Sequence, residues 1–567
     1  MSEQQSQPTR RHLPLILIGG FGSSSTDDEK KSTYLGFNVG SAYHHKKGEN
    51  HIYEGMILRF LKSDWQYHDA TNVIFYRGKE IEHEPIIPRK IKYIEEMSSQ
   101  EATLPDQLQR LKDKNIVDKF HNLQANGLFS GNRVIVDPAM ALKFLELAED
   151  PYRSLWVFRY YDLKERNFEA YGNALVRLID CIREIAADEQ GVKPKVNIIA
   201  YSMGGLVIRQ AIQETYPQRY LQAEDYINKV VTLGTPHRGI TFQIFKDWLG
   251  SEAEKDLERM NPQNQDDTDN PNSFWNFKNY FPLERLLTVV GTNYRPYHNW
   301  SGTWLNRIFS ESNEYGINYN RSDGLVKQIA AQIPGAPRTF VHKCHGGFDS
   351  LITSRESFEV TTRFLFGNVR VRLRMVKAQI SRGKDLFGKS EFFLGVSIKP
   401  RGVDFELFHQ SKEAENCYGP FNEDNLTDEN PAFPWADDNK LIWEGYLNST
   451  SILEDESIQP KDMVMRLDFY VGERDLSGIG FSDNLIFRKH YYVRALLTES
   501  TPELYLHNHE LFALPDFQPE PQEMMRMVED GWHFDVVGTG FKGRFSIEIE
   551  RIPEYGQPES LMHAIDG

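Results

Sequence analysis

The sequence has few cysteines, no net basic charge and no long apolar runs. Its 567 residues include three cysteines, Cys181, Cys344 and Cys417, which are far apart and lack the spacing of a metal site. This usage predicts no disulfide framework and fits a reducing compartment. Acidic residues outnumber basic ones, 81 against 65, and the formal charge is −16. This excess argues against a general nucleic-acid binder, because phosphates need a basic surface.

No segment approaches the roughly 18 apolar residues that a membrane-spanning helix needs. The first apolar run, Leu13–Ile18, is too short even for the core of a signal peptide. These absences predict a cytoplasmic protein without a transmembrane segment, and they leave open export by a route that reads no N-terminal signal. The remaining composition, 40% hydrophobic and 26% charged, is that of a globular protein, and its length predicts about two or three domains.

Apolar segments alternate with amphipathic helical patterns between residues 13 and 367, which predicts a parallel sheet covered on both faces. Strands are expected at 13–18, 154–160, 196–200, 230–233, 285–290 and 339–341. Helices are expected at 165–187, 203–215 and 354–366. Outside this alternation we expect polar tails at 1–12 and 557–567, and an insertion at about 32–150 that includes a strand at 72–76 and charged helical stretches such as 104–120.

Near Gly367 the hydrophobic pattern changes to a period of two. Apolar residues at 369, 371, 373 and 375 alternate with basic ones, which is typical of a strand with one solvated face. Further short strand-like runs, separated by turn-rich segments, predict an antiparallel β-sandwich over residues 368–556. The expected fold class is therefore α/β with a C-terminal antiparallel β-sandwich, and the basic strand face leaves peripheral membrane contact through this sandwich open.

Ser202 lies where an apolar strand, Val196–Ala200, meets a helical pattern that begins at Met203. A serine hydroxyl needs a base to remove its proton and a site for the negative charge that develops. A sharp strand-to-helix turn supplies such a site, because the first N–H groups of the helix point toward the side chain. The turn requires small residues two positions before and after the serine, and Ala200 and Gly204 meet this requirement.

The segment Ala200–Gly204 resembles the nucleophile elbow of the α/β-hydrolases, in their lipase and esterase branch. The family pattern usually begins with glycine, and some bacterial lipases have alanine there. Leu233–His237 is similar to a motif of the inositol-deacylase-like and lecithin:cholesterol acyltransferase-like lipases, in which His237 would shape a loop. The resemblance covers roughly residues 13–367. It implies a mostly parallel sheet covered by helices, with oxyanion loop, serine, acid and histidine in this chain order.

The resemblance implies a catalytic triad of Ser202, Asp323 and His345. Asp323 lies in a turn-rich loop after the strand expected at 285–290, and Asp247, after the preceding strand, is the alternative acid. His345 lies in a glycine-rich loop just before the last helix. His342, which continues the strand at 339–341, is the alternative base.

The oxyanion is expected to bind to the backbone N–H groups of Phe21 and Met203. The implied reaction is hydrolysis of a carboxylic ester, of a lipid or another acyl compound, through an acyl-enzyme, with no metal or cofactor. An acyltransferase with the same triad, and a non-catalytic hydrolase fold whose sandwich binds a membrane or protein, are the alternatives. Residues 251–282 form either a lid over the acyl pocket or an apolar patch under a long loop.

Overall fold

The structure is a computed structural model of the 567-residue chain. It describes residues 12–20, 55–62, 65–81, 87–188, 190–239, 254–294, 321–346, 350–380, 390–412, 414–421, 441–448, 461–475, 484–497, 502–514, 517, 519–528, 531–538 and 540–552. The described residues form two compact units, divided between Leu286 and Leu287. The boundary expected near residue 367 between a hydrolase domain and a sandwich stays a prediction.

Five strands of the first unit form a parallel sheet in the order β2-β5-β1-β6-β7. Their bounds are Leu15–Ile18 (β1), His68–Asp69 (β2), Ser154–Phe158 (β5), Val196–Tyr201 (β6) and Ile227–Leu233 (β7). Every residue of β1, β5 and β6 is buried, as expected for central strands with helices on both faces of the sheet. The α/β class predicted for this part of the chain is confirmed.

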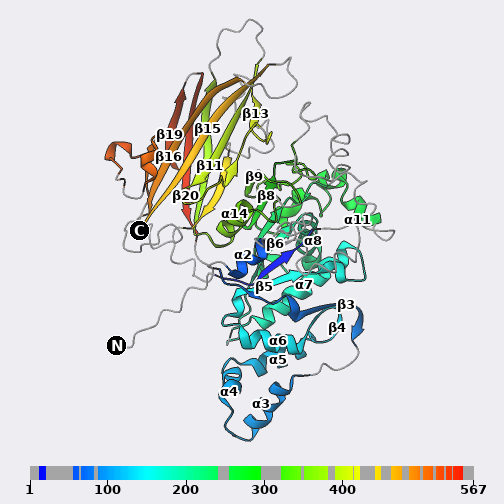
Figure 1. Ribbon diagram of the computed structural model, residues 1–567. Helices are drawn as coiled ribbons and strands as arrows, with labels where there is room; N and C mark the ends of the chain where they lie inside the picture. Colours follow the sequence, from blue (N-terminus) through cyan, green and yellow to red (C-terminus); the bar gives the residue numbers. More distant parts are fainter. Residues whose placement is uncertain are drawn as a thin grey trace, which may run out of the picture. The chain divides into compact units, whose positions relative to one another are not determined.

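The helix expected over 165–187 is α7 (Phe168–Ile185), which packs against α8 (Gly204–Gln210) (Figure 1). Asn167 begins α7, because its side-chain oxygen accepts a hydrogen bond of 2.7 Å from the N–H of Ala170. After α8 the helical backbone widens into a π-turn, η5 (Ala211–Thr215), and ends with α9 (Tyr216–Gln218); a 3-10 turn, η6 (Ala223–Asp225), then leads to β7.

The described part of the range expected as an insertion is mostly helical (Figure 1). It contains α2 (Met56–Lys62), η2 (Thr71–Val73), β3 (Ile74–Ile81), α3 (Arg89–Ser99), α4 (Asp106–Asp113), α5 (Ile116–Ala125), β4 (Gly131–Val136) and α6 (Pro138–Leu147). Strands β3 and β4 pair in antiparallel fashion. The charged stretch expected to be helical over 104–120 is helical but divided, because Asn115 has a left-handed φ of 52° that separates α4 from α5.

The short 3-10 turns η3 (Pro151–Arg153) and η4 (Tyr160–Asp162) flank β5. Toward the end of the unit come α11 (Glu254–Arg259), α12 (Pro262–Asp266), η7 (Phe274–Asn279) and η8 (Leu283–Arg285). Within this segment, Phe274, Phe277 and Phe281 are buried, whereas the Trp275 side chain is 39% exposed. Three of the aromatic rings thus favour the apolar-patch interpretation, and the lid stays a prediction.

The second unit begins with two parallel strands, β8 (Leu286–Gly291) and β9 (Arg338–Val341), followed by α14 (Arg355–Phe366). Ser354 caps α14 with its side-chain oxygen, which accepts a hydrogen bond from the N–H of Ser357. These elements match the strands expected at 285–290 and 339–341 and the helix expected at 354–366.

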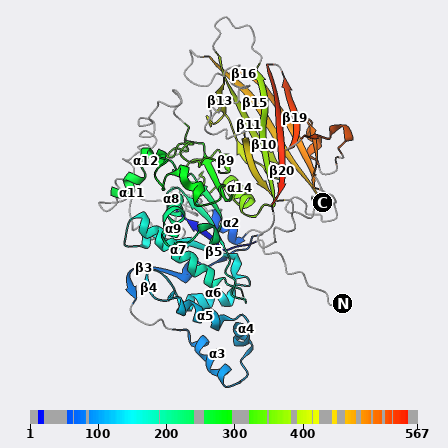
Figure 2. The same ribbon diagram turned by 180° about the vertical axis from the view of Figure 1, so that it is seen from behind.

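The described residues between 369 and 551 form two antiparallel sheets, which confirms the β-sandwich class predicted for the C-terminal region (Figure 2). The first is ordered β14-β10-β20-β19-β18, from Leu441–Leu447 (β14), Val369–Ile380 (β10), Phe541–Arg551 (β20), Gly531–Gly538 (β19) and Arg526–Val528 (β18). The second is ordered β12-β11-β15-β16-β17, from Phe408–His409 (β12), Ser390–Pro400 (β11), Lys461–Asp475 (β15), Asn484–Leu497 (β16) and Glu503–His507 (β17), with β13 (Tyr418–Phe421) also on β11. Two 3-10 turns, η9 (Glu510–Ala513) and η10 (Pro521–Glu523), connect β17 to β18. Phe469 of the second sheet contacts Phe545 of the first, with ring centres 4.6 Å apart, so the two sheets share an aromatic core.

The basic face expected on the first strand of the sandwich is paired with carboxylates of its neighbours. Ion pairs cross from β10 to β14 and β20: Arg372 Nε to Glu444 Oε2 at 2.6 Å, Arg374 Nε to Glu548 Oε1 at 2.6 Å, and Arg370 Nε to Glu550 Oε2 at 3.0 Å. The sequence left membrane contact through this face open because of its positive charge, and these carboxylates offset that charge.

Within the second unit, β9 and α14 pack directly against the sandwich. The rings of Phe340 and Phe408 lie 5.4 Å apart, and those of Phe364 and Tyr446 lie 4.8 Å apart. Thr339 Oγ1 also donates a 2.5 Å hydrogen bond to the carbonyl of Leu407. The end of the predicted hydrolase region and the sandwich therefore share one core.

Candidate active site

Ser202 occupies a strained turn between β6 and α8. Its φ is 51°, in the left-handed region that few non-glycine residues adopt, and a backbone held there marks a site that the surrounding structure enforces. The N–H of Ser202 donates a 2.9 Å hydrogen bond to the carbonyl of Leu233 at the end of β7, and its own carbonyl accepts one of 3.1 Å from Gly205. The predicted strand, turn and helix are all present around this serine.

The glycines of the turn allow backbone and side chains to approach closely. A Cβ on Gly204 would lie 2.5 Å from the carbonyl oxygen of Ile18, and one on Gly20 would lie 2.7 Å from the Cβ of Ser202. Both distances are too short for real contacts, so alanine at either position would force the turn to open. Ala200, in contrast, is fully buried in β6, and the fold accommodates its methyl group where glycine is commoner.

Met203, an expected oxyanion donor, is the residue that precedes α8, and its side chain is buried. The N–H groups at a helix start lack partners within the helix, which makes them suitable donors for an anion. Phe21, the other expected donor, lies outside the described residues, as does Asp247, the alternative acid. Gly20, which precedes Phe21, is described and buried.

Asp323 and His345 form a buried pair in the second unit. Nδ1 of His345 lies 2.8 Å from Oδ2 of Asp323, and the exposed fractions of the two residues are 3% and 1%. The N–H of His345 also donates a 2.8 Å hydrogen bond to the carbonyl of Asp323. A carboxylate placed on Nδ1 holds the imidazole in the tautomer whose Nε2 can accept a proton, which is the arrangement that a general base needs.

The carboxylate of Asp323 is itself fixed by its loop. Its Oδ1 accepts hydrogen bonds from the N–H of Leu325 at 3.1 Å and of Val326 at 2.8 Å. Gly324 adopts a φ of +102°, which allows the backbone to turn back toward the carboxylate. At the end of β8, a Cβ on Gly291 would lie 2.6 Å from the Cβ of Asp323, so the absence of a side chain at this position leaves room for the aspartate.

His342, the alternative base, has other partners. Its Nδ1 lies 3.1 Å from Oγ1 of Thr292, and its ring centre lies 5.3 Å from that of His409. The structure thus brings Asp323 together with His345 in the second unit, whereas Ser202 and Met203 belong to the first unit. The catalytic roles of these residues stay predictions.

His237, expected to shape a loop, is fully buried next to Thr232 of β7. Its Nε2 lies 3.0 Å from Oγ1 of Thr232. Burial and the nearby Arg209 guanidinium hold the pKa of His237 well below its ordinary value, so the ring is neutral. A buried neutral imidazole suits the structural role predicted for it.

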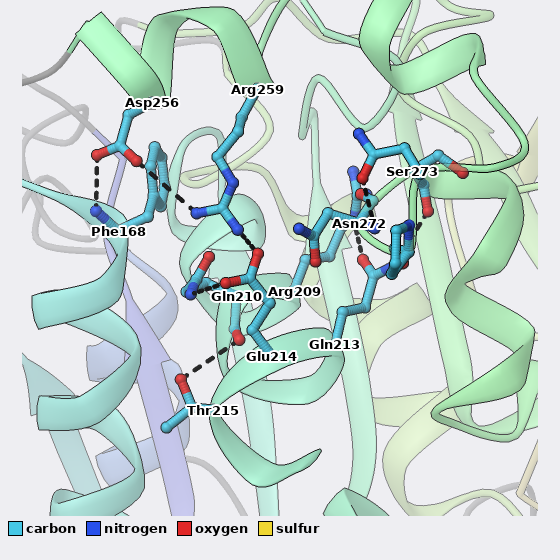
Figure 3. A network of polar contacts seen from close by, with 12 residues as sticks. Phe168, Arg209, Gln210, Gln213, Glu214, Thr215, Asp256, Arg259, Asn272 and Ser273 are labelled. Carbon is cyan, nitrogen blue, oxygen red and sulfur yellow. Dashed lines mark hydrogen bonds and ion pairs between the residues drawn. The ribbon is translucent and has the colours of Figure 1, made fainter. Parts of the chain in front are cut away.

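Sequence reasoning did not single out Arg209, which is buried on α8 seven residues after Ser202 (Figure 3). Its guanidinium donates to four acceptors: the His237 carbonyl at 2.7 Å, the Asn272 carbonyl at 2.6 Å, Gln265 Oε1 at 2.9 Å and Gln213 Oε1 at 2.8 Å. Burial, and then the charge of Arg259, lower the pKa of Arg209 to about 9. A charged residue within the apolar run of α8 was the available signal, but three of its four acceptors lie 28 to 63 residues later in the chain.

Ion pairs and side-chain amides extend this network (Figure 3). Glu214 pairs with Arg259, and Asp256 accepts a 2.8 Å hydrogen bond from the N–H of Phe168 at the start of α7. Nε2 of Gln213 donates to the carbonyl of Ser273 at 3.0 Å. The helix that follows Ser202 is thereby tied to the described part of the 251–282 segment.

Replacing Arg209 with methionine should lower the free energy of unfolding by about 3 kcal/mol, because buried carbonyl and amide oxygens would lose their donor. The midpoint of urea unfolding, followed by tryptophan fluorescence, measures the loss. Arg238→Met is the matched control: its ion pair with Asp266, 2.7 Å long, is partly exposed, so its loss should cost less than about 1 kcal/mol. Equal midpoints for the two variants would contradict the anchoring role of Arg209.

Among the described residues, no group of three or more His, Cys, Asp or Glu side chains is arranged to hold a metal ion. Of the helices in the described ranges, none has the length and apolar character required to cross a bilayer.

Residues 163–249 match the model of a family described as "Putative serine esterase (DUF676)", and the match includes α7, Ser202 and His237. Among solved structures, the mature form of the Bacillus licheniformis lipase BlEst2 is similar over 36% of this chain and 76% of its own, at 21% identity and a TM-score of 0.24. One domain of plant Extended Synaptotagmin 1 is similar over 33% of this chain and 98% of its own, at 12% identity and a TM-score of 0.17. No curated protein matches the chain. The family match supports an esterase-type hydrolase; TM-scores this low carry no argument about function.

Proposed function

We propose that this chain is a serine-dependent hydrolase of carboxylic esters, with Ser202 as nucleophile, His345 as base and Asp323 as the acid that orients it. The observation that carries the proposal is the buried 2.8 Å contact between Asp323 Oδ2 and His345 Nδ1. The left-handed backbone of Ser202 and the serine esterase match around it support the assignment of the nucleophile.

In the proposed reaction, Nε2 of His345 takes the hydroxyl proton as Oγ of Ser202 attacks the ester carbonyl. The N–H groups of Met203 and Phe21 stabilise the resulting oxyanion, and the protonated imidazole then donates its proton to the departing alcohol. Water, deprotonated by His345, attacks the acyl-enzyme and releases the carboxylic acid and Ser202. The negative carboxylate of Asp323 stabilises the imidazolium that exists between these steps.

We further propose that the substrate is a lipid or another ester with an apolar acyl chain, on the resemblance of the elbow and of Leu233–His237 to lipase motifs. Aryl esters of graded acyl length give the test. Rates that rise with chain length would support an acyl-binding site, whereas rates that fall steadily beyond acetate would contradict the lipid assignment and leave the esterase assignment intact.

A fluorophosphonate probe tests the nucleophile directly, because it phosphonylates only a serine that a base has activated. We expect stoichiometric labelling of native protein at Ser202, located by mass spectrometry of the peptide that contains it, and no labelling after heat denaturation. Labelling at a different serine, or an unlabelled native protein, would contradict the proposal.

A further inference from the structure

A cavity of the first unit is lined mainly by charged side chains and has a volume of about 590 Å³. Such a volume lies within the range of about 300–1,000 Å³ typical of small-molecule sites. It lies where β4 and α5, from the range expected as an insertion, pack against α7. Five basic side chains line it: Arg133, Arg177, Arg183, Lys193 and Arg219.

Only two acidic side chains, Asp180 and Glu184, line the same cavity. A third carboxylate, that of Glu165, pairs with Arg133 from outside the lining, so the five cations exceed these carboxylates by two charges. The excess stands out because the whole chain carries a formal charge of −16. Glu184 forms an ion pair with Lys193. Burial raises the pKa of Asp180, while Arg219, Arg183, Lys193 and Arg177 lower it, which places this carboxyl within electrostatic reach of four of the five cations.

Two of the arginines are held in place by the backbone. Arg177 donates from Nε to the carbonyl of Val134 at 2.6 Å and from Nη2 to the carbonyl of Ser130 at 2.7 Å. Arg183 donates from Nε to the carbonyl of Pro194 at 2.8 Å, and its guanidinium carbon lies 4.3 Å from the ring centre of Tyr226. Neutral carbonyl partners fix the position of a guanidinium without cancelling its charge, so the cavity is preorganised for an anion.

The other two arginines of the cavity use only part of their N–H donors in hydrogen bonds to the protein. Arg219 donates from Nη2 to Oδ1 of Asn173 at 3.0 Å, and Arg133 from Nε to Oε2 of Glu165 at 2.9 Å. Each guanidinium carries five N–H donors, so both can still offer a pair of parallel N–H groups to an oxyanion. Planar, bidentate donors of this kind match phosphate geometry better than that of a monovalent ion.

We propose that this cavity binds a phosphorylated small molecule with at least two negative charges. The charge excess, the volume and the guanidinium groups held by backbone carbonyls carry the proposal together. A phosphate of this kind occurs in free metabolites and in phospholipid headgroups alike, so the site is defined by the chemistry that the two share.

Isothermal titration calorimetry of the full chain with inorganic pyrophosphate, at low ionic strength, tests the site. The double variant Arg219→Gln/Lys193→Gln should weaken binding at least about tenfold, because two of the five positive charges that line the cavity are removed. Lys112→Gln, which removes an exposed lysine of α4, is the matched control and should bind as the wild type does. Thermal unfolding of each variant shows whether the fold is intact.

Asp180→Asn gives a change of the opposite sign that loss of fold cannot mimic. Removing this negative charge should tighten pyrophosphate binding by about threefold to tenfold. Vesicles with and without phosphatidic acid identify the source: binding to the former that the double variant loses supports the same site with a lipid headgroup. No binding of either probe, equal binding by all variants, or weaker binding by Asp180→Asn would overturn the proposal. The readout does not depend on esterase activity.

Discussion

Ser202→Ala is expected to hydrolyse aryl esters about a million times more slowly than the wild-type chain, measured as kcat. The substitution removes only the hydroxyl group, without which no acyl-enzyme can form. A small rate above that of water should remain, because the oxyanion donors still bind the polarised carbonyl. KM should change little, since the alanine leaves the substrate contacts in place.

The matched control is Ser99→Ala, on an exposed turn of α3, where the hydroxyl hydrogen-bonds only locally to the carbonyl of Glu96. This variant should keep wild-type kcat and KM. Equal rates for Ser202→Ala and wild type would reject the catalytic interpretation and return the chain to the class of non-catalytic hydrolase folds.

Asp323→Asn should lower kcat by about 10⁴-fold with little loss of stability. The amide keeps the size of the carboxyl, and its oxygen can still accept from the N–H groups of Leu325 and Val326, which now bond Oδ1. Its NH₂ group, however, would face Nδ1 of His345 and favour the tautomer with hydrogen on Nε2. In that tautomer Nε2 cannot take a proton from a serine.

Two histidine variants separate this role from a general weakening of the loop. His345→Ala should lose activity to the same degree as Asp323→Asn, and the double variant should lose little more, because the two side chains act as a unit. His342→Ala should retain activity within about tenfold, since its contacts are with Thr292 and His409. If His342→Ala were the inactive variant, the base would be misassigned.

The turn at Ser202 was predictable because all its determinants are local. An apolar strand, a small residue on either side of the serine and a helical pattern follow one another within Val196–Thr215. The pairing of Asp323 with His345 was predictable by a different route, namely the chain order of the resembled family. The sequence between Asp323 and His345 shows no pattern that predicts contact between these two side chains.

What the sequence did not reveal depends on distant partners. The charges on β10 looked like a basic face because the carboxylates that neutralise them, Glu444, Glu548 and Glu550, are 72 to 180 residues away in the chain. Arg209 was missed because two of its four acceptors are backbone carbonyls, which no sequence pattern marks, and a third, Gln265, lies 56 residues later in the chain. The break at Asn115 was missed because the apolar spacing continues across it, and the left-handed backbone that asparagine tolerates interrupts the helix.

The sandwich and the loop of Asp323 are not interchangeable modules. Nε2 of Gln328, five residues after Asp323, donates a 2.8 Å hydrogen bond to the carbonyl of Ala414, and Thr339 bonds the carbonyl of Leu407. Truncation of the chain after Gly367 would therefore remove these hydrogen bonds from the Asp323 loop and from β9, the strand that leads to His345. Domain shuffling in evolution, and protein engineering in the laboratory, would have to transfer the sandwich together with Asp323 and His345.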